Sequence, residues 1–584
     1  MRFLETFLAA GLAASSIAQA ARVVHDWNIT YTTANPDGLK ERRVIGVNGK
    51  WPPPAIHVNI NDTLVINVHN GLDEPTALHP HGQFQNGTVW MDGPAGVTQC
   101  PIPPGYDLTY EFPIIQTGSF WIHSHYMGQY MDGLRSPLVL HNPNEPYKYD
   151  EDITFPLSDW YHDDYHKGLD TFMSVYNPTG AEPVPQSGFM MENVNSSLTF
   201  QPGKTYRLRL INMSGFSTYF FSIDGHDLDI IEIDGIDTER KTVKSVYLTA
   251  AQRISVLVTA KNATSLNYLM HADMDTGMFD VLPEDLKTNV TAPLYYDASH
   301  NNFAPSEDVG MGSDFDDIAI PPLHRAAAVE PDHQVNLTFN FDVTTDGLNR
   351  GMFNEIPYLT PKVPTLNTLF SIGGNLSSNV DVYGPQTMAY VLKHLDMVEI
   401  VLNNLDDGDH PFHLHGHAFQ IVARGEGLYT GNKSEATWVI DNPTTRDTVL
   451  VPGLGYTIIR FRADNPGVWF FHCHIEWHLE TGLAATFIEA PDVALQRMTL
   501  PQAFYDLCEA GGNPSKGNAA AKQGLDLSGA PDGIRLIFDG FTAKGKGAMA
   551  ACIIAAILGI ASIIWYALAD PQKQAKEIAA AKRN

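Results

Sequence analysis

Short stretches in which apolar and polar residues alternate follow one another along most of the chain, from about residue 22 to residue 490. Residues 62–69, 205–211 and 397–402 are clear examples, and Gly, Pro, Asn and Asp lie between the stretches. A period of two is typical of strands with one buried face, and these turn residues mark the strand ends. Strands this short and regular predict antiparallel β-sandwiches rather than a parallel α/β sheet.

A weak internal repeat connects the beginning and the end of this β region. Each copy contains an alternating stretch that leads into one histidine-rich segment and is followed by a second one; the copies lie at residues 62–125 and 397–474. The region between them, residues 144–310, has similar strands but no His-X-His pair. We therefore expect a first and a last domain of one kind around a different middle domain.

Long apolar segments lie at both ends of the chain. Residues 1–20 run from Arg2 to an Ala-Gln-Ala sequence, the pattern of a secretory signal peptide that is cleaved after Ala20. Residues 548–569 carry no charge and are long enough for a membrane-spanning helix, which needs about 20 residues. A buried helix is the alternative. A removable lipid-anchor signal would end in its apolar tail, whereas a polar, lysine-containing tail follows here.

These features predict the organisation of the whole chain. We expect a signal peptide (1–20), three β domains (21–143, 144–310 and 311–510, the last beginning with an acidic linker), a stalk (511–546), a transmembrane helix (547–569) and a cytoplasmic tail (570–584). Because the signal peptide directs the amino terminus outward, a single span gives a type I protein with its β domains outside the cytosol.

The composition restricts the partners and the compartment. The chain has 66 Asp and Glu residues against 37 Lys and Arg, the opposite of the basic footprint that nucleic-acid binding requires. Ten Asn-X-Ser/Thr sequons favour a glycosylated ectodomain; they begin at Asn28, Asn61, Asn86, Asn195, Asn212, Asn262, Asn289, Asn336, Asn375 and Asn432.

The four cysteines have different expected roles. Cys552 lies inside the apolar span and is expected to pack as a small apolar side chain. Cys473 lies between two histidines and is a candidate metal ligand. Cys100 and Cys508 remain, and in an oxidising compartment they form the predicted disulfide, which would connect the first domain to the end of the last.

Four His-X-His pairs are the strongest chemical signal in the sequence. Residues two apart on a strand point to the same face, so each pair directs two imidazoles at one point. One pair alone is weak evidence, but four pairs at equivalent places in two repeated domains predict a shared metal site. The pairs are His79/His81, His123/His125, His413/His415 and His472/His474.

The last pair contains a cysteine, which adds a second kind of site. The Cys473 side chain points away from the face that His472 and His474 share. A thiolate with two imidazoles and a weak or absent axial ligand is typical of a type 1, blue copper centre. His410 and His478 are the nearby unpaired histidines, and Leu483 takes the axial position. Zinc is the alternative metal, although the surrounding imidazole cluster favours copper redox chemistry over a closed structural site.

These histidine-rich segments resemble the four copper motifs of the multicopper oxidases. The resemblance rests on residues 79–81, 121–125, 410–415 and 472–478 and covers essentially the whole ectodomain. It implies an all-β fold of three cupredoxin-like Greek-key sandwich domains with four copper ions. It also implies a type 1 ion on His410, Cys473 and His478, and a type 2 ion on His79 and His413. The implied ligands of a type 3 pair are His81, His123, His125, His415, His472 and His474.

Within this family, the chain is most similar to the membrane-anchored fungal ferroxidases of the Fet3 type. The resemblance implies that Glu182, Asp280 and Asp406 bind iron and connect it to the type 1 copper. Asp280 has a slightly different local spacing, and Asp273 and Asp275 are its alternatives. Carboxylate oxygens favour Fe3+ over Fe2+ and so make Fe2+ a better electron donor.

Two further acids match residues that act close to the three-copper cluster. Asp92 and Glu476 are candidates to supply protons for O2 reduction, or to hydrogen-bond a copper ligand. His162 and His166 belong to no motif, and we expect ordinary polar roles for them.

The sequence thus predicts a ferroxidase that oxidises Fe2+, reduces O2 to water and supplies Fe3+ to an iron permease of a high-affinity uptake system. The expected location is the plasma membrane, with the vacuolar membrane as the alternative. A laccase-like oxidase of phenols or aromatic amines is the second hypothesis, because it would keep every copper ligand but would need neither the carboxylates nor the anchor. A non-catalytic copper-binding protein is the third and weakest.

Overall fold

The computed structural model describes residues 20–310, 315–537 and 543–583. The predicted signal peptide lies outside the described residues except for Ala20. The chain forms two units, one that ends at Arg535 and one that begins at Leu536.

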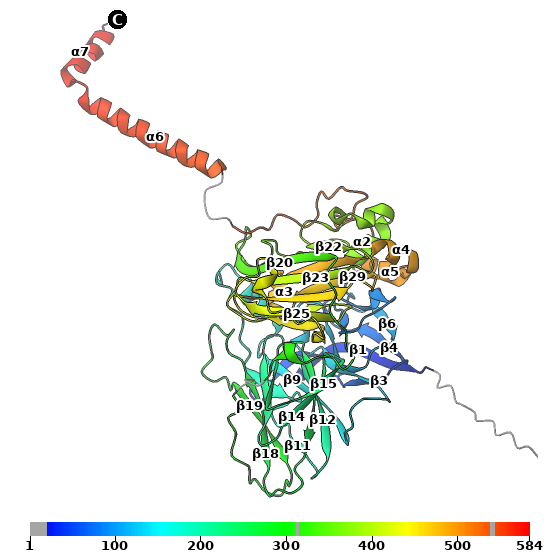
Figure 1. The fold of residues 1–584 in the computed structure, drawn as a ribbon. Helices are drawn as coiled ribbons and strands as arrows, with labels where there is room; N and C mark the ends of the chain where they lie inside the picture. Colours follow the sequence, from blue (N-terminus) through cyan, green and yellow to red (C-terminus); the bar gives the residue numbers. More distant parts are fainter. Residues whose placement is uncertain (1–19, 311–314, 538–542, 584) are drawn as a thin grey trace, which may run out of the picture. The chain divides into compact units, whose positions relative to one another are not determined.

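Among the described residues, the first unit contains six β-sheets, two in each of three lobes (Figure 1). In the first lobe, one sheet has the order β2-β1-β4-β6 and the other the order β3-β8-β7-β5. The strands are β1 (Arg22–Ala34), β2 (Arg42–Val47), β3 (Ile56–Asn59), β4 (Thr63–Asn70), β5 (Leu78–His81), β6 (Asp107–Pro113), β7 (Gly118–Ser124) and β8 (Arg135–His141). Exposed and buried residues alternate along β6, whereas β7 is buried throughout.

The middle lobe has one six-stranded and one five-stranded sheet, with the orders β10-β9-β12-β17-β14-β15 and β11-β19-β18-β13-β16. Its strands are β9 (Glu151–Trp160), β10 (Ser187–Met190), β11 (Leu198–Thr199), β12 (Thr205–Asn212), β13 (Tyr219–Ile223), β14 (Leu228–Ile233), β15 (Ile236–Val243), β16 (Ser245–Leu248), β17 (Arg253–Thr259), β18 (Tyr268–Met274) and β19 (Asn289–Tyr295). Its hydrophobic core is separate from the core that the other two lobes share.

The last lobe repeats this arrangement, with the orders β21-β20-β23-β28-β25-β26 and β22-β30-β29-β24-β27. Its strands are β20 (His333–Val343), β21 (Asn349–Phe353), β22 (Ala389–Leu392), β23 (Met397–Asn404), β24 (His410–Leu414), β25 (Phe419–Glu426), β26 (Thr445–Arg446), β27 (Thr448–Val451), β28 (Gly455–Arg462), β29 (Gly467–Cys473) and β30 (Ala484–Glu489). The prediction of a mostly β sandwich protein is confirmed.

Short helices lie between the strands of the first unit and after the last strand. They are α1 (Tyr165–Phe172), α2 (Thr365–Ile372), α3 (Glu476–Thr481), α4 (Pro491–Arg497) and α5 (Gln502–Ala510), with 3-10 turns at Val89–Met91, Met127–Tyr130, Asp317–Ala319, Gly374–Ser378, Val380–Tyr383 and Lys433–Glu435. Cys508 on α5 forms a disulfide with Cys100, as predicted.

The segment after α5 was expected to begin a stalk, and its first part packs on the last lobe. The backbone N–H of Ala519 donates to the Val382 carbonyl over 2.9 Å, and Gln386 donates to the Ile534 carbonyl over 3.2 Å. Ala519 and Ala520 are buried. The chain therefore leaves the first unit only after Arg535.

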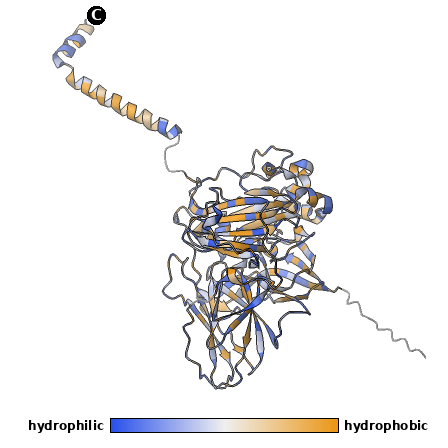
Figure 2. Cartoon of the chain, viewed as in Figure 1, coloured by the Kyte–Doolittle hydropathy of each residue, from blue (hydrophilic) through white to orange (hydrophobic). Residues whose placement is uncertain are grey.

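The second unit contains α6 (Ala543–Leu568) and α7 (Pro571–Ala581). The most apolar 18-residue window within residues 544–568 has a mean hydropathy of 2.5, and the helix is long and apolar enough to cross a membrane. In Figure 2 most residues of α6 are coloured as hydrophobic, and mostly hydrophilic residues follow it in α7. Asp570 separates the two helices and caps α7 by accepting a hydrogen bond from the Gln572 N–H.

The predicted glycosylation sites differ in exposure. Nine of the ten sequon asparagines are exposed, but Asn212 is buried at the end of β12. Its side-chain amide donates hydrogen bonds to the carbonyls of Ser217 and Leu248. In the folded chain this sequon is closed to a glycan.

Candidate metal centres

Two pairs of antiparallel strands carry most of the histidines, one pair in the first lobe and one in the last, and His125, His415 and His474 directly follow their strands. In the first lobe β5 pairs with β7, so that His79 lies opposite His123. In the last lobe β24 pairs with β29, so that His413 lies opposite His472. The repeat seen in the sequence is thus a repeated strand pair.

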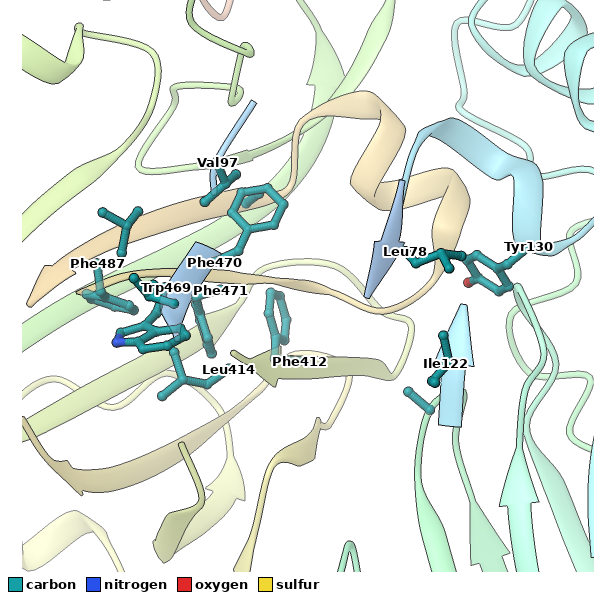
Figure 3. Packing of buried hydrophobic residues seen from close by; sticks show 14 of the residues in the cluster. Leu78, Val97, Ile122, Tyr130, Phe412, Leu414, Trp469, Phe470, Phe471 and Phe487 are labelled. Carbon is teal, nitrogen blue, oxygen red and sulfur yellow. The ribbon is translucent and has the colours of Figure 1, made fainter. Parts of the chain in front are cut away.

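Because side chains alternate between the two faces of these strands, the histidines lie on one face and the apolar side chains that form the core lie on the other. On β24, Phe412 and Leu414 lie on either side of His413, and on β29 Phe471 directly precedes His472. Figure 3 shows these three apolar side chains. The rings of Phe412 and Phe471 stack at 5.5 Å in the core of the last lobe. This core fixes the strands, so the histidines on the opposite face hold fixed positions.

Eight imidazoles from the two lobes meet in one cluster. The rings of His81 and His413 lie 3.7 Å apart and those of His79 and His415 lie 4.0 Å apart, although each pair joins different lobes. Several sets of three have ligand atoms within 4.8 Å of one another. The cluster comprises His79, His81, His123, His125, His413, His415, His472 and His474.

Hydrogen bonds on one nitrogen aim the other nitrogen into the cluster. The Nδ1 atoms of His79, His123 and His413 contact the carbonyls of Asp92, Ser124 and Asp447 over 2.7–2.9 Å. Their Nε2 atoms are buried without a partner, as are both ring nitrogens of His474. A buried polar atom without a partner costs free energy, and a metal ion would satisfy these nitrogens. The residues therefore fit the metal cluster that the motifs predict.

Burial also keeps the imidazoles in the form that binds metals. It lowers the pKa of His123, His125, His415 and His472 well below the ordinary histidine value, and the neighbouring imidazoles add to this effect. The neutral imidazole is the metal ligand.

Cys473 and two histidines form a second, smaller centre. The Cys473 Sγ lies 3.5 Å from His478 Nδ1 and 3.9 Å from His410 Nδ1, and the two Nδ1 atoms are 3.1 Å apart. All three side chains are fully buried. Burial raises the pKa of the Cys473 thiol, so the thiolate needs a metal ion to stabilise it. Leu483, also fully buried, accepts a hydrogen bond from the Cys473 N–H through its carbonyl and offers no side-chain ligand.

Two of the three predicted iron-site carboxylates contact this centre from outside. Glu182 Oε1 lies 2.7 Å from His478 Nε2, and Asp406 Oδ2 lies 3.0 Å from His410 Nε2. Each imidazole thus has the thiol on one nitrogen and a carboxylate on the other. Burial works against ionisation of Asp406, but the hydrogen bond from His410 holds its pKa below the ordinary value.

Asp280 is exposed and stands in the electrostatic field of the other acids. Its pKa is raised by partial burial and then by the negative charges of Glu182, Asp407 and Asp406. The two alternatives have partners elsewhere, because Asp273 pairs with Asn289 and Asp275 accepts from the Tyr247 hydroxyl over 2.9 Å. This arrangement favours Asp280 over both alternatives as the third acid.

The two acids predicted near the cluster are both buried there. Asp92 Oδ2 lies 2.9 Å from His415 Nδ1, and Asp92 Oδ1 lies 3.3 Å from His79 Nδ1. Glu476, at the start of α3, lines a cavity of about 370 Å³ together with His125. Burial, and then the charge of Glu480, raises the pKa of Glu476 well above the ordinary value.

Two other observations concern residues outside the predicted ligand set. One agrees with the sequence analysis, and the other concerns a residue that the sequence analysis missed. His162 and His166 form hydrogen bonds with Asp37 and Glu74 and take no part in the centres. Asp447 was missed: its carboxylate lies 3.4 Å from His81 Nε2 and 3.5 Å from His413 Nδ1. It follows Arg446 in a short connection between β26 and β27, and nothing in the sequence distinguishes it from the many other acids of the chain.

Comparisons with known proteins agree with this geometry. Three sequence models, each described as multicopper oxidase, match residues 28–145, 151–299 and 358–493. The chain is 45% identical to "Iron transport multicopper oxidase fetC" of Epichloe festucae, over 97% of this chain and 93% of the relative. It is 40% identical to "Iron transport multicopper oxidase FET3" of Saccharomyces cerevisiae, over 96% of this chain and 91% of the relative.

Solved structures show the same relationship. The crystal structure of Fet3p, described as a multicopper oxidase that functions in iron import, superimposes with a TM-score of 0.85 at 38% identity, covering 89% of this chain and 100% of that chain. The laccase from Botrytis aclada gives a TM-score of 0.75 at 31% identity, covering 84% of this chain and 92% of that chain. The predicted cupredoxin-like fold is thereby confirmed.

Proposed function

The chain belongs to the multicopper oxidase family, and from this premise we propose that it is a ferroxidase that oxidises Fe2+ to Fe3+ and reduces O2 to water. Copper is its cofactor. Bound copper would accept single electrons at the cysteine-containing centre and deliver four of them to O2 at the histidine cluster. The balanced reaction consumes four Fe2+, one O2 and four protons, and yields four Fe3+ and two water molecules.

The proposed ligands follow from the geometry of the two centres. His410, Cys473 and His478 would hold the type 1 ion. His79 and His413 would hold the type 2 ion. The type 3 pair would be held by His81, His123, His125, His415, His472 and His474. The unpartnered nitrogens in the cluster support this ligand set.

The observation that carries the iron assignment is the pair of carboxylates on the outer nitrogens of His410 and His478. Hard carboxylate oxygens bind Fe2+ and favour the Fe3+ product. Glu182 would bind the substrate ion and at the same time accept a hydrogen bond from the imidazole that contacts Cys473. The contacts from carboxylate to imidazole and from imidazole to thiol are 2.7 and 3.5 Å.

The chain also offers groups for the protons that O2 reduction consumes. Glu476 lines an open cavity that reaches His125, so we assign it to proton delivery from solvent. Asp92 contacts two cluster histidines from different lobes, so we assign it to their orientation and to local proton transfer.

The phenol-oxidising alternative retains one observation in its favour, the structural similarity to the Botrytis aclada laccase. A phenol requires no carboxylates to hold a cation, so this alternative leaves the contacts of Glu182 and Asp406 without a role in substrate binding. The two relatives named above, which match over 93% and 91% of their own lengths, are named iron transport oxidases.

Membrane attachment completes the proposal. The apolar helix α6 would anchor the protein as a single-pass type I protein of the plasma membrane, with the vacuolar membrane as the alternative. An iron permease in the same membrane would take up the Fe3+ product. The names of the relatives, which refer to iron transport, support this coupling.

The discriminating experiment compares kcat and KM for Fe2+ and for a bulky phenol in Glu182→Ala and Asp406→Ala. We expect a KM for Fe2+ that rises by about 10-fold or more in Glu182→Ala, because a charge-assisted contact contributes about 1.5–3 kcal/mol. Asp406→Ala should act more on kcat. Asp273→Ala is the matched control, because Asp273 is an acid paired with Asn289. Equal losses on iron and phenol at normal copper content would refute the iron site. Unchanged iron kinetics in the double variant would favour the laccase-like alternative.

A further inference from the structure

The middle lobe supplies no histidine to the cluster, yet one of its side chains reaches the cluster's edge. Arg253 is the first residue of β17, and its guanidinium is fully buried. We propose that Arg253 is a positioning residue for the copper cluster, holding the Asp447 carboxylate against His81 and His413. The middle lobe would thus complete a metal site to which it gives no ligand. This inference rests on the ligand set proposed above, and not on the identity of the reductant.

Asp447 determines which nitrogen two imidazoles present to the cluster. Its Oδ1 lies 3.4 Å from Nε2 of His81, whose Nδ1 is buried without a partner. The same carboxylate oxygen and the Asp447 carbonyl lie 3.5 and 2.9 Å from Nδ1 of His413, whose Nε2 is buried without a partner. The hydrogen bond on one ring nitrogen decides which nitrogen binds a metal. Asp447 therefore leaves Nδ1 of His81 and Nε2 of His413 free to face the cluster, although the two histidines belong to different lobes.

Arg253 fixes this carboxylate with two parallel hydrogen bonds. Its Nη1 donates to Asp447 Oδ1 over 2.7 Å, and its Nη2 donates to Oδ2 over 2.6 Å. A bidentate pair of this kind sets the plane of the carboxylate as well as its distance. The Thr448 hydroxyl adds a third donor to Oδ1 over 2.8 Å.

Arg253 is itself held by two lobes. Its Nε donates to the Ser119 carbonyl on β7 of the first lobe over 3.0 Å, and its backbone N–H donates to Asp234 over 2.8 Å. Asp234 also accepts from Arg446, the residue before Asp447, over 2.9 Å. The guanidinium is thus the point where strands of the first and middle lobes meet a loop of the last.

The space around the pair leaves little room for another arrangement. Gly82 follows His81 directly, and a Cβ atom at this position would lie 2.7 Å from both Arg253 Nη2 and Asp447 Oδ2. Gly82 has a φ of 84°, which also favours glycine. The ligand-bearing strand β5 therefore ends in contact with the ion pair.

Removing Arg253 would leave a buried carboxylate without its counter-charge beside two metal ligands. Such a carboxylate has to move, take up a proton or admit water, and each of these changes alters its contacts with His81 and His413. Changes to groups that hydrogen-bond metal ligands typically weaken metal affinity by about 10–100-fold.

A second buried arginine of the middle lobe provides a matched control. Arg209 on β12 is also fully buried, pairs with Asp152 over 2.7 Å, and reaches the first lobe at the Ser119 hydroxyl over 3.2 Å. It shares its sheet and its inter-lobe contact with Arg253, but its partners are Asp152, Glu145, Glu232 and Ser119. Arg209→Met therefore reports the general cost of losing a buried arginine.

The test measures copper retention in the full-length holoenzyme. The variants Arg253→Met, Arg253→Lys, Asp447→Asn and the Arg253→Met/Asp447→Asn double variant are titrated with a copper chelator. The type 2 electron paramagnetic resonance signal is the readout, and the blue type 1 absorption is the internal reference. We expect a type 2 affinity about 10–100-fold weaker in Arg253→Met and in Asp447→Asn. The double variant should be no weaker than either single one, because both act through one contact. Arg253→Lys should be intermediate, and Arg209→Met should match the wild type.

Three results would overturn the proposal. The first is a type 2 copper affinity and hyperfine splitting in Arg253→Met that equal those of the wild type. The second is a loss of copper affinity in Arg209→Met as large as that in Arg253→Met. The third is a loss of copper affinity in the double variant that equals the sum of the two single losses. If Arg253→Met does not accumulate as folded protein, the Asp447→Asn variant decides. Wild-type copper retention in Asp447→Asn would overturn the proposal, because it would show that the acid through which Arg253 is proposed to act is not needed. No arm of the test uses iron, so its failure is distinguishable from failure of the proposed ferroxidase function.

Discussion

Removing the disulfide between Cys100 and Cys508 should lower the free energy of unfolding by several kcal/mol. Both cysteine residues are buried, at 2% and 0% exposure. The bridge connects residues 408 apart in the sequence. In the chain-entropy description, closing a loop of this length removes about 20 cal/mol/K from the unfolded ensemble, or about 6 kcal/mol at 25 °C. Native disulfides removed from small domains typically cost about 2–5 kcal/mol, so we expect a loss of about 3–6 kcal/mol for the double alanine variant.

The native contacts near the bridge explain why the fold itself should persist. The backbone N–H groups of Thr365 and Leu366 donate to the carbonyls of Gly96 and Val97, over 3.2 and 2.8 Å. These bonds connect the first and last lobes independently of Cys100. The same two lobes supply all eight cluster histidines, so a weaker connection should also speed the loss of copper from the cluster.

Guanidinium unfolding of the double alanine variant, followed by near-ultraviolet circular dichroism and by the blue absorption, checks this prediction. Cys552→Ala is the control, because this exposed cysteine lies on α6. A loss below about 1 kcal/mol at full copper content would refute the loop-entropy reasoning. A variant that is unfolded without denaturant would refute it in the other direction, by showing that the bridge holds the native packing of α5.

Three other changes test the centres and the anchor. Cys473→Ser should abolish the blue absorption and all oxidase turnover while the thermal unfolding temperature falls little; a blue, active variant would contradict the type 1 assignment. The KM for Fe2+ should rise as the pH falls through the raised pKa of Asp280, because protonation removes a negative charge from the proposed cation site, and Asp280→Asn should flatten this part of the pH profile. Truncation after Arg535 should release a soluble, copper-loaded enzyme with normal Fe2+ oxidation in vitro but poor iron uptake in cells; full uptake would count against a coupled permease.

The strands and the positions of most candidate metal ligands could be predicted from the sequence because their signals are local. A His-X-His pair in an alternating stretch fixes both the strand and the face on which the two imidazoles lie. His79 and His123 lie opposite each other in the paired strands, but their pairing could be inferred only by analogy with the second copy. The bridge between Cys100 and Cys508 was predicted by elimination, because Cys473 was a candidate metal ligand and Cys552 lay inside the apolar span. The domain boundaries at 143/144 and 310/311 stay a prediction.

The contacts that hold the ligands could not be predicted, because they connect distant parts of the chain. Asp447 and Arg253 are 194 residues apart, and neither lies in a motif. Asn212 illustrates the same limit: its sequon looks like the other nine, and only the packing of β12 closes it. A single sequence reports side-chain type and local period, whereas burial and long-range pairing depend on how the sheets stack.

Glu182 and Asp406, the two carboxylates outside the cysteine-containing centre, bear on both the choice of substrate and the stability of the site. A buried imidazole needs a partner for its second nitrogen, and water or a carbonyl would serve as well as an acid. Glu182 and Asp406 instead place two negative charges where a reductant must approach. On the proposed assignment they favour a small cation over a neutral phenol, which would have to displace a charged hydrogen bond in order to reach the same imidazole edge.

Replacing Glu182 by Gln keeps a hydrogen-bonding partner and removes the charge. It should therefore retain the blue centre, raise the KM for Fe2+, and leave phenol oxidation unchanged or faster. A loss of the blue absorption in Glu182→Gln would show that the acid is needed to hold His478, and would remove the argument from charge.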